Sequence, residues 1–308
     1  MPPTPTPPQP PTPPPPGDAA LAAAFAFADA NARRTHHRTN VLALPNAASP
    51  LCIVFLHGLW GQLRELAPLI QHAAQAHSVL AFDSVGHGRS AASVDPADYT
   101  TDVIVKDTAD FVEQFAPPHA SRFVLVGHSY GCTIAARLAL EWARRDAVAG
   151  IFLIAPKSEL ASHEAVLIDR LAPFVPSATV DAASWVDSKL GSVSVISLAA
   201  LSRNATPMLR AEQTAMFNVM SGIAKKNTLL GARFAGKDVY EQLRLPIMLV
   251  GGTLDTIAPV VPNITNIEKW VAVPATRVHL LISGHQVMLE QHAKVNDLLD
   301  AFIADITP

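Results

Sequence analysis

The sequence predicts an α/β fold in which a mostly parallel, doubly wound sheet carries an inserted helical cap. From residue 41 onward, short runs of apolar residues alternate with longer segments of helical period, a pattern typical of βαβ units with right-handed crossovers. Between residues 155 and 246 the alternation stops, and about ninety residues without a convincing strand are too many for a loop. We therefore expect a sheet core over 41–156 and 246–308 and a helical cap over 157–245.

Each expected strand is a continuous apolar run of strand length, which indicates a strand buried on both faces. The runs are LCIVFL (51–56), SVLAFD (78–83), RFVLVG (122–127), GIFLIA (150–155), PIMLVGG (246–252) and VHLLIS (278–283). Between them, residues 102–115 place Ile104, Phe111, Val112 and Phe115 on one helical face, and residues 287–303 have the same period.

The first forty residues divide into two parts. Residues 1–16 contain eleven prolines, a composition that favours extended, unpacked chain, so we expect a disordered tail over 1–17. Residues 18–40 should form an alanine-rich surface helix with Asp18 as its N-cap, followed by the lead-in to the sheet. The apolar run in that helix is about half of the ~20 residues that cross a bilayer, so a surface helix is favoured over a membrane or targeting segment.

The composition excludes several kinds of partner. The net charge is −3, with acids and bases interspersed, which argues against nucleic acid and against an anionic membrane surface. Cys52 and Cys132 are far apart and each lies in an apolar element, which predicts core residues and not a disulfide or zinc site. We expect a cytoplasmic protein with a small-molecule partner, no metal, no cofactor and no integral membrane segment; the oligomeric state stays open.

One serine stands between two glycines where an expected strand passes directly into a helix: Gly127, Ser129 and Gly131 in RFVLVGHSYGCTIAARLAL. The residue at such a turn adopts a strained backbone conformation and projects its side chain at the carboxyl edge of the sheet. Its neighbours two residues before and after then nearly collide, so glycine suits both positions. We predict a nucleophile elbow at Ser129; the alternative is a helix-capping serine.

Two further residues complete a triad in the required chain order, nucleophile, acid and histidine. Asp255 lies just past a strand in LVGGTLDTIAP, and His285 follows the last strand in LISGHQVMLEQ. A serine hydroxyl needs a base to take its proton, and that base needs a carboxylate to orient it. Taken singly, the alternatives are a turn-capping aspartate and a surface histidine. Glu159, after the preceding strand, is a weaker candidate for the acid.

An oxyanion hole is expected in VFLHGLWGQ, where a strand ends at Leu56 and the chain turns through Gly58. The backbone N–H groups of Leu59 and of Tyr130, next to the serine, can together bind a developing oxyanion. Trp60 beside this turn is either a pocket wall or a core residue.

Five motifs in this order resemble the α/β-hydrolase superfamily, in particular its capped esterase, lipase and epoxide-hydrolase-like members: HGLWG, FDSVGHGRS, GHSYG, GGTLDTIAP and SGHQVMLEQ. The resemblance runs from Val41 to Ile306. It implies an α/β-hydrolase fold whose first strands are shortened or hidden in residues 34–46. It also implies roles for the following residues: a triad of Ser129, Asp255 and His285, oxyanion donors Leu59 and Tyr130, and a structural turn of Asp83, Gly86 and Gly88.

Departures from the family narrow the expected chemistry. Epoxide hydrolases and haloalkane dehalogenases carry an aspartate nucleophile, whereas Ser129 would form an acyl-enzyme. Some lipid-acting relatives carry an acyltransferase signature of His, four residues and Asp, and here Glu290 stands at that interval from His285. We expect a serine hydrolase, carboxylesterase- or lipase-like, that cleaves carboxylic ester or thioester bonds of small apolar acyl substrates. The alternatives are an acyltransferase and a ligand-binding receptor on the same fold.

The cap is expected to cover an apolar cavity, because its apolar residues recur at the spacing of amphipathic helices. These residues are Leu167, Leu171, Phe174, Trp185, Val186, Met216, Phe217 and Met220. Its basic residues are dispersed and therefore expected in solvent: Lys157, Arg170, Lys189, Arg203 and Arg210.

Overall fold

A computed structural model of the chain describes residues 16–35, 39–158, 168, 170–271, 273 and 276–307. In that part of the chain, one eight-stranded sheet has the strand order β1-β2-β4-β3-β5-β6-β7-β8. β1 pairs with β2 and β2 with β4 in antiparallel fashion, and all other neighbours are parallel. The strands are β1 (Arg33–Arg34), β2 (Asn40–Leu44), β3 (Leu51–Leu56), β4 (Ser78–Phe82), β5 (Arg122–His128), β6 (Val148–Ile154), β7 (Ile247–Gly252) and β8 (Arg277–Leu281).

The predicted α/β fold is confirmed, and all six expected strands are present with ends that shift by at most a few residues. β2 lies in the segment 34–46 where the resemblance placed a hidden strand. One expected helix is divided: α12 (Val287–Glu290) and α13 (His292–Ile306) are separated at Gln291, whose φ of −127° and ψ of 34° leave the helical region.

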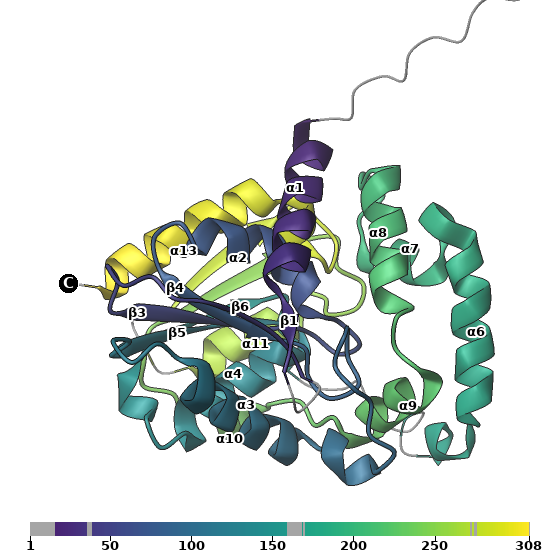
Figure 1. The fold of residues 1–308 in the computed structure, drawn as a ribbon, viewed down its shortest axis with the longest axis horizontal. Coiled ribbons are helices and arrows are strands. Elements are labelled where there is room, and N and C mark those ends of the chain that lie inside the picture. Colours follow the sequence, from purple (N-terminus) through teal and green to yellow (C-terminus); the bar gives the residue numbers. More distant parts are fainter. Residues whose placement is uncertain are drawn as a thin grey trace, which may run out of the picture.

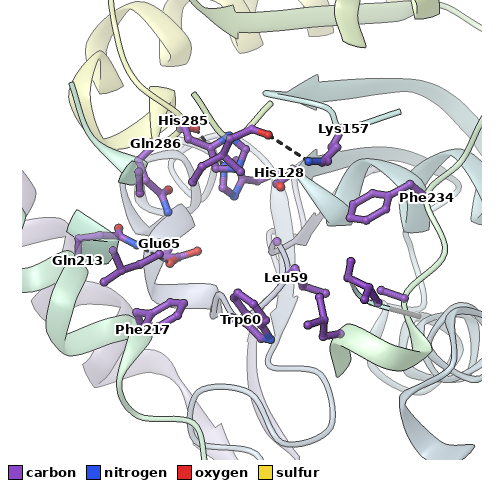
Figure 2. A pocket seen from close by; sticks show the side chains of 18 residues that line it. Leu59, Trp60, Glu65, His128, Lys157, Gln213, Phe217, Phe234, His285 and Gln286 are labelled. Carbon is purple, nitrogen blue, oxygen red and sulfur yellow. Dashed lines mark hydrogen bonds between the residues drawn. The ribbon is translucent and has the colours of Figure 1, made fainter. Parts of the chain in front are cut away.

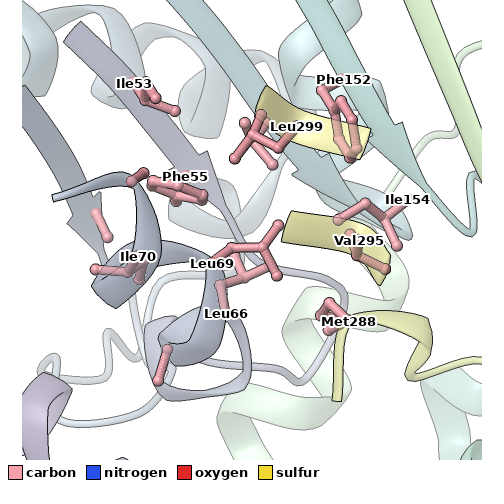
Figure 3. Close-up of a cluster of buried hydrophobic side chains, with 14 of the residues drawn as sticks. Ile53, Phe55, Leu66, Leu69, Ile70, Phe152, Ile154, Met288, Val295 and Leu299 are labelled. Atoms are coloured by element: carbon pink, nitrogen blue, oxygen red, sulfur yellow. The ribbon is translucent and has the colours of Figure 1, made fainter. Parts of the chain in front are cut away.

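Helices cover both faces of the sheet (Figure 1). α1 (Pro16–Asn31), α2 (Ala67–Ala73) and α13 pack on one face, and α3 (Thr101–Phe115), α4 (Tyr130–Glu141) and α11 (Asn263–Trp270) pack on the other. Successive residues of β3 alternate between the two cores: Ile53 and Phe55 join the first (Figure 3), whereas Cys52 and Val54 join the second. This alternation follows from the two-residue period of a strand, and it explains why the strands are continuous apolar runs.

The N-terminal helix differs in part from the prediction. It begins at Pro16, so that Asp18 lies in its first turn and accepts a hydrogen bond from Thr206 Oγ1 at 2.7 Å instead of capping the helix. It lies at the surface, as expected, with one face exposed, but its other face, with Leu21, Ala24, Phe25 and Ala28, is buried in the first core. Their spacing of three and four residues places them on one helical face. Residues 1–15 of the expected tail lie outside the described residues.

The described residues between β6 and β7 form helices and contain no strand. Four of them, α6 to α9, lie together beyond one end of the sheet (Figure 1), and Gln62 Nε2 ties them to the core by donating to Met216 O at 2.9 Å. The helices are η4 (Ala172–Phe174), α6 (Ser177–Leu190), η5 (Gly191–Val193), α7 (Val195–Ala200), α8 (Pro207–Phe217), α9 (Gly222–Gly231) and α10 (Lys237–Tyr240). No helix in the described ranges is long and apolar enough to cross a membrane.

The sequence predicts that the apolar residues of this insertion cover a cavity. Only some of them do. Met216 and Met220 are buried and Phe217 lines a pocket, but Leu171, Phe174, Trp185 and Val186 are exposed. Phe174 is 83% exposed and Trp185 64%, so the prediction is wrong for these four. Helical spacing shows that residues share a face and not what that face contacts. Leu167 lies outside the described residues.

Candidate active site

A strained turn holds Ser129 between β5 and α4. β5 ends at His128 and α4 begins at Tyr130, and the backbone of Ser129 has φ 52° and ψ −115°, an unusual conformation for a non-glycine residue. A Cβ atom on Gly127 would lie 2.5 Å from Gly131 O, and one on Gly131 would collide with the carbonyl oxygen of Leu56. The two glycines therefore permit the close approach of β5, α4 and the end of β3.

The loop after β3 lies directly against this turn. A Cβ on Gly58 would be 3.0 Å from Ser129 Cβ. His57 fixes the loop, because its Nδ1–H donates to Gly58 O at 2.8 Å while its Nε2 accepts from the backbone N–H of Ser84 at 3.0 Å. Burial lowers the pKa of His57, which keeps the ring neutral and able to accept.

The expected oxyanion donors both border the serine. Leu59 follows Gly58 and lines the same pocket as Ser129. Tyr130 is the first residue of α4, so its N–H has no acceptor within the helix. Next to Leu59, Trp60 has a φ of 60° and is half-buried. Trp60 lines the pocket, so of the two expectations for this residue, pocket wall or core residue, the first is the one observed.

Asp255 and His285 form a buried pair. His285 Nδ1 lies 2.7 Å from Asp255 Oδ2, and the two side chains are 6% and 1% exposed. Asp255 Oδ1 also accepts the backbone N–H groups of Ile257 and Ala258, both at 2.8 Å. Burial alone would raise the pKa of Asp255, but the charge of His285 and these hydrogen bonds outweigh it and lower the pKa. The carboxylate thus stays ionised beside the imidazole.

Ser129 and His285 line one pocket. Among the described residues no hydrogen bond joins the Ser129 and His285 side chains; the His285 ring is bonded to Asp255 through Nδ1. The structure therefore brings the three predicted triad residues to one place at the carboxyl edge of the sheet. Glu159, the weaker candidate acid, lies outside the described residues.

Two residues without an assigned role hold the His285 loop. His128 Nε2–H donates to the carbonyl oxygen of His285 at 3.2 Å, and the two rings are 4.9 Å apart. Burial and the charge of His285 lower the pKa of His128 to about 3, so it acts as a neutral donor. Glu290 Oε1 accepts the N–H groups of Gly284 at 2.8 Å and Ser202 at 3.0 Å. The only signal in the sequence for this role of His128 is its position directly before Ser129.

The turn after β4 supports the site from behind. The Asp83 carboxylate accepts the N–H groups of Leu63 at 2.8 Å and Arg89 at 2.9 Å, and the side-chain amide of Asn40 at 2.7 Å. Gly86 and Gly88 have φ values of 72° and 49°, and a Cβ on Gly88 would collide with the Asp83 carboxylate. These contacts link the turn to the loop that carries Leu59.

The pocket over Ser129 has a volume of about 360 Å³ and mostly apolar walls. Figure 2 shows Leu59, Trp60, Phe217 and Phe234 around it. The apolar lining comes from the β3 loop, the helical insertion and the loop after β7, which are far apart in sequence: Leu59, Trp60, Ile168, Ile196, Phe217, Leu229, Phe234 and Ile257. Such a pocket suits an apolar substrate group held beside the serine.

One wall of the pocket is polar, and sequence analysis did not find it. Glu65 is 2% exposed and accepts a hydrogen bond from Gln213 Nε2 at 3.4 Å, with Gln286 beside them (Figure 2). Burial raises the pKa of Glu65 to about 7. These residues come from three distant parts of the chain, so no local motif signals them.

The expectation that the basic residues of the insertion are solvated is wrong for Lys157. This side chain is 8% exposed, lines the pocket, and donates from Nζ to Ile257 O at 3.2 Å. Lys157 follows β6 closely, and strand ends of a parallel sheet converge on the site. In the described residues, no group of three or more His, Cys, Asp or Glu side chains could hold a metal ion.

Comparison with known proteins agrees with the fold. The family model described as "Alpha/beta hydrolase family" matches residues 53–298. An abhydrolase domain-containing protein of Schizosaccharomyces pombe is 27% identical over 271 residues, which cover 84% of this chain and 71% of that protein. Protein ABHD8 of Bos taurus is 25% identical over 281 residues, and the match spans 88% of this chain and only 61% of ABHD8.

Among solved structures, the enol-lactonase of Burkholderia xenovorans is similar, with a TM-score of 0.69, 16% identity, and coverage of 89% of this chain and 99% of that one. At this identity the similarity concerns the fold. The family match spans most of the chain, and the strand order and the turn at Ser129 agree with it. The chain therefore belongs to the alpha/beta hydrolase family.

Proposed function

We propose that this protein is a serine hydrolase that cleaves carboxylic ester or thioester bonds of apolar acyl substrates through an acyl-enzyme intermediate. One observation carries the proposal: Ser129, held in a strained turn, shares an apolar pocket with the buried His285–Asp255 pair. A serine at this position, unlike an aspartate, leads to an acyl-enzyme, which excludes the alkyl-enzyme chemistry of epoxide opening.

In the first half-reaction His285 takes the Ser129 proton as the serine oxygen attacks the substrate carbonyl carbon. The carbonyl π electrons move to oxygen, and the backbone N–H groups of Leu59 and Tyr130 stabilise the negative charge. Asp255 holds Nδ1–H of His285, so that Nε2 is the accepting nitrogen. The intermediate then collapses, the bond to the alcohol or thiol breaks, and His285 returns its proton to that leaving group.

In the second half-reaction a water molecule takes the place of the leaving group. His285 removes its proton, the water oxygen attacks the acyl carbon, and the new intermediate expels Ser129. The proton returns to Ser129 and the carboxylic acid departs. The burial of Asp255 and His285 suits these reaction steps, because hydrogen bonds to an ionised group are stronger away from water.

The direct test is labelling with a fluorophosphonate, followed by mass spectrometry of the labelled peptide. We expect labelling at Ser129 and hydrolysis of p-nitrophenyl butyrate, with both lost in Ser129→Ala. Ser188→Ala, on the exposed surface of α6, is the matched control and should retain both. Labelling or turnover that persists in Ser129→Ala would contradict the proposal.

A further inference from the structure

A second apolar cavity lies inside the helical insertion and adjoins the pocket over Ser129. It has a volume of about 500 Å³ and runs between η4, α6, α7 and α9. We call it the insertion groove. Four residues line both spaces: Trp60, Ile196, Phe217 and Leu229. The remaining walls include Val180 and Ala183 of α6 and Ala199 of α7.

The shared wall is a pair of aromatic rings. The rings of Trp60 and Phe217 meet edge to face, with centroids 5.7 Å apart and an angle of 84°. Trp60 Nε1–H donates to Lys225 O at 2.9 Å, so the one polar atom of the indole already has a hydrogen-bond partner. The wall therefore presents hydrocarbon to each side.

Two basic side chains line the groove, and both are already engaged; Lys226 Nζ donates to Pro173 O at 2.7 Å. Lys225 is 3% exposed, and its Nζ donates to Ser184 Oγ at 2.7 Å and to Asn218 Oδ1 at 3.4 Å. It also lies 4.0 Å from the centroid of the Phe217 ring. These contacts engage both ammonium groups, so the groove suits a hydrocarbon chain better than an anionic head group.

The groove also opens toward solvent at its far side. Val195 and Val175, which line it, are 71% and 37% exposed. Together, the pocket over Ser129 and the insertion groove, which share four lining residues, offer apolar space for a longer chain than the pocket alone. Exposed apolar lining of this kind costs free energy until a ligand covers it.

The chemistry of the proposed reaction decides which half of an ester lies there. His285 must give its proton to the leaving group, so the alcohol lies on the side of His285 and its neighbour Gln286, at the polar wall with Glu65. The acyl carbon bears the oxyanion at the loop of Leu59, which is followed directly by Trp60. From there the acyl chain can extend along Trp60 toward the insertion groove.

We propose that the substrates are esters of long-chain acyl groups, with the chain crossing the Trp60–Phe217 wall and its far part lying in the insertion groove. This inference rests on the proposed function. Each buried methylene should raise kcat/KM by roughly threefold to fourfold until the groove is filled. The wild-type protein should therefore prefer p-nitrophenyl laurate to p-nitrophenyl butyrate.

Two substitutions on one helix test the inference. Val180→Trp fills the groove, and Val186→Trp places the same side chain on the exposed face of α6, outside the groove. We expect Val180→Trp to lower the laurate-to-butyrate ratio of kcat/KM at least tenfold, and Val186→Trp to leave the ratio within twofold of wild type. Ala199→Phe, on α7, should act like Val180→Trp. An unchanged ratio in both groove variants would overturn the inference.

A binding measurement separates this inference from the proposed function. A fluorescent long-chain fatty acid should bind the Ser129→Ala variant, which cannot turn over an ester, and Val180→Trp added to it should weaken binding at least tenfold. If the wild-type protein hydrolyses no ester yet this binding pattern holds, the proposed function fails and the groove assignment stands. If esters are hydrolysed but laurate offers no advantage and the fatty acid does not bind, the groove assignment fails alone.

Discussion

The free energy of unfolding of the wild-type protein should fall as the pH rises past the pKa of an unfolded glutamate. Glu65→Gln should abolish this fall. The Glu65 side chain lies in the polar wall of the pocket, 2% exposed, with Gln213 Nε2 as a donor at 3.4 Å. Burial raises its pKa from 4.5 to about 7, against smaller opposing effects of Gln213 and of the charge of His285. Glutamine keeps the size of the side chain and cannot ionise.

The sign follows from the two pKa values. Between pH 4.5 and about 7 the folded protein holds a proton on Glu65 that the unfolded chain has released, so wild-type stability falls as the pH rises through this window. The difference of about 2.5 pH units, at roughly 1.36 kcal/mol each, corresponds to about 3 kcal/mol. Relative to wild type, Glu65→Gln should therefore gain up to about 3 kcal/mol between pH 4.5 and pH 8.

The assay is urea unfolding of both proteins at several pH values across this range, with the difference in the free energy of unfolding plotted against pH. Glu268→Gln, on the exposed surface of α11, is the matched control for the substitution itself and is measured in the same way. A constant difference between wild type and Glu65→Gln would refute the reasoning, because it would mean that Glu65 ionises alike in the folded and unfolded chain.

Three other changes have definite expected outcomes. Asp255→Asn should fold with a melting temperature near that of wild type but lower kcat by roughly 10⁴-fold in an ester assay, because the wrong His285 tautomer would face Ser129; near-normal turnover would exclude Asp255 as the acid. Gly131→Ala should destabilise the fold by ~3 kcal/mol or more in thermal unfolding, because its Cβ would overlap the Leu56 carbonyl oxygen, whereas Gly17→Ala, with nothing within 4 Å, should have little effect. Deletion of residues 1–15 should leave kcat/KM and the melting temperature nearly unchanged, since the described contacts of α1 with the body begin at Asp18; a fall in either would show that the tail docks on the protein.

Sequence patterns were sufficient where one local physical requirement selects the residue type. The core strands are covered by helices on both faces, so each reads as an unbroken apolar run, and all six were found. The glycines around Ser129 stand where any Cβ would meet backbone atoms, so their spacing reports a turn directly. Asp255 and His285 could be predicted because the carboxyl ends of parallel strands meet at one edge of the sheet.

The polar wall and the orientation of the insertion depend instead on contacts between distant segments. Glu65, Gln213 and Gln286 meet across more than two hundred residues of sequence, and nothing near any of them marks it as a pocket residue. Nothing in the sequence around Lys157 distinguishes it from a solvent-exposed lysine, yet packing buries its side chain.

By itself, the sequence determined the α/β class, the order of the core strands along the chain and the local geometry at Ser129, because backbone sterics and strand burial act over a few residues. The tertiary structure alone decided that one face of α1 belongs to the core, that Phe174 and Trp185 face solvent, and that Trp60 and Phe217 divide two apolar spaces. The physical reason is that amphipathic spacing defines a face of a helix, whereas the surface that this face meets is set by the packing of the whole chain.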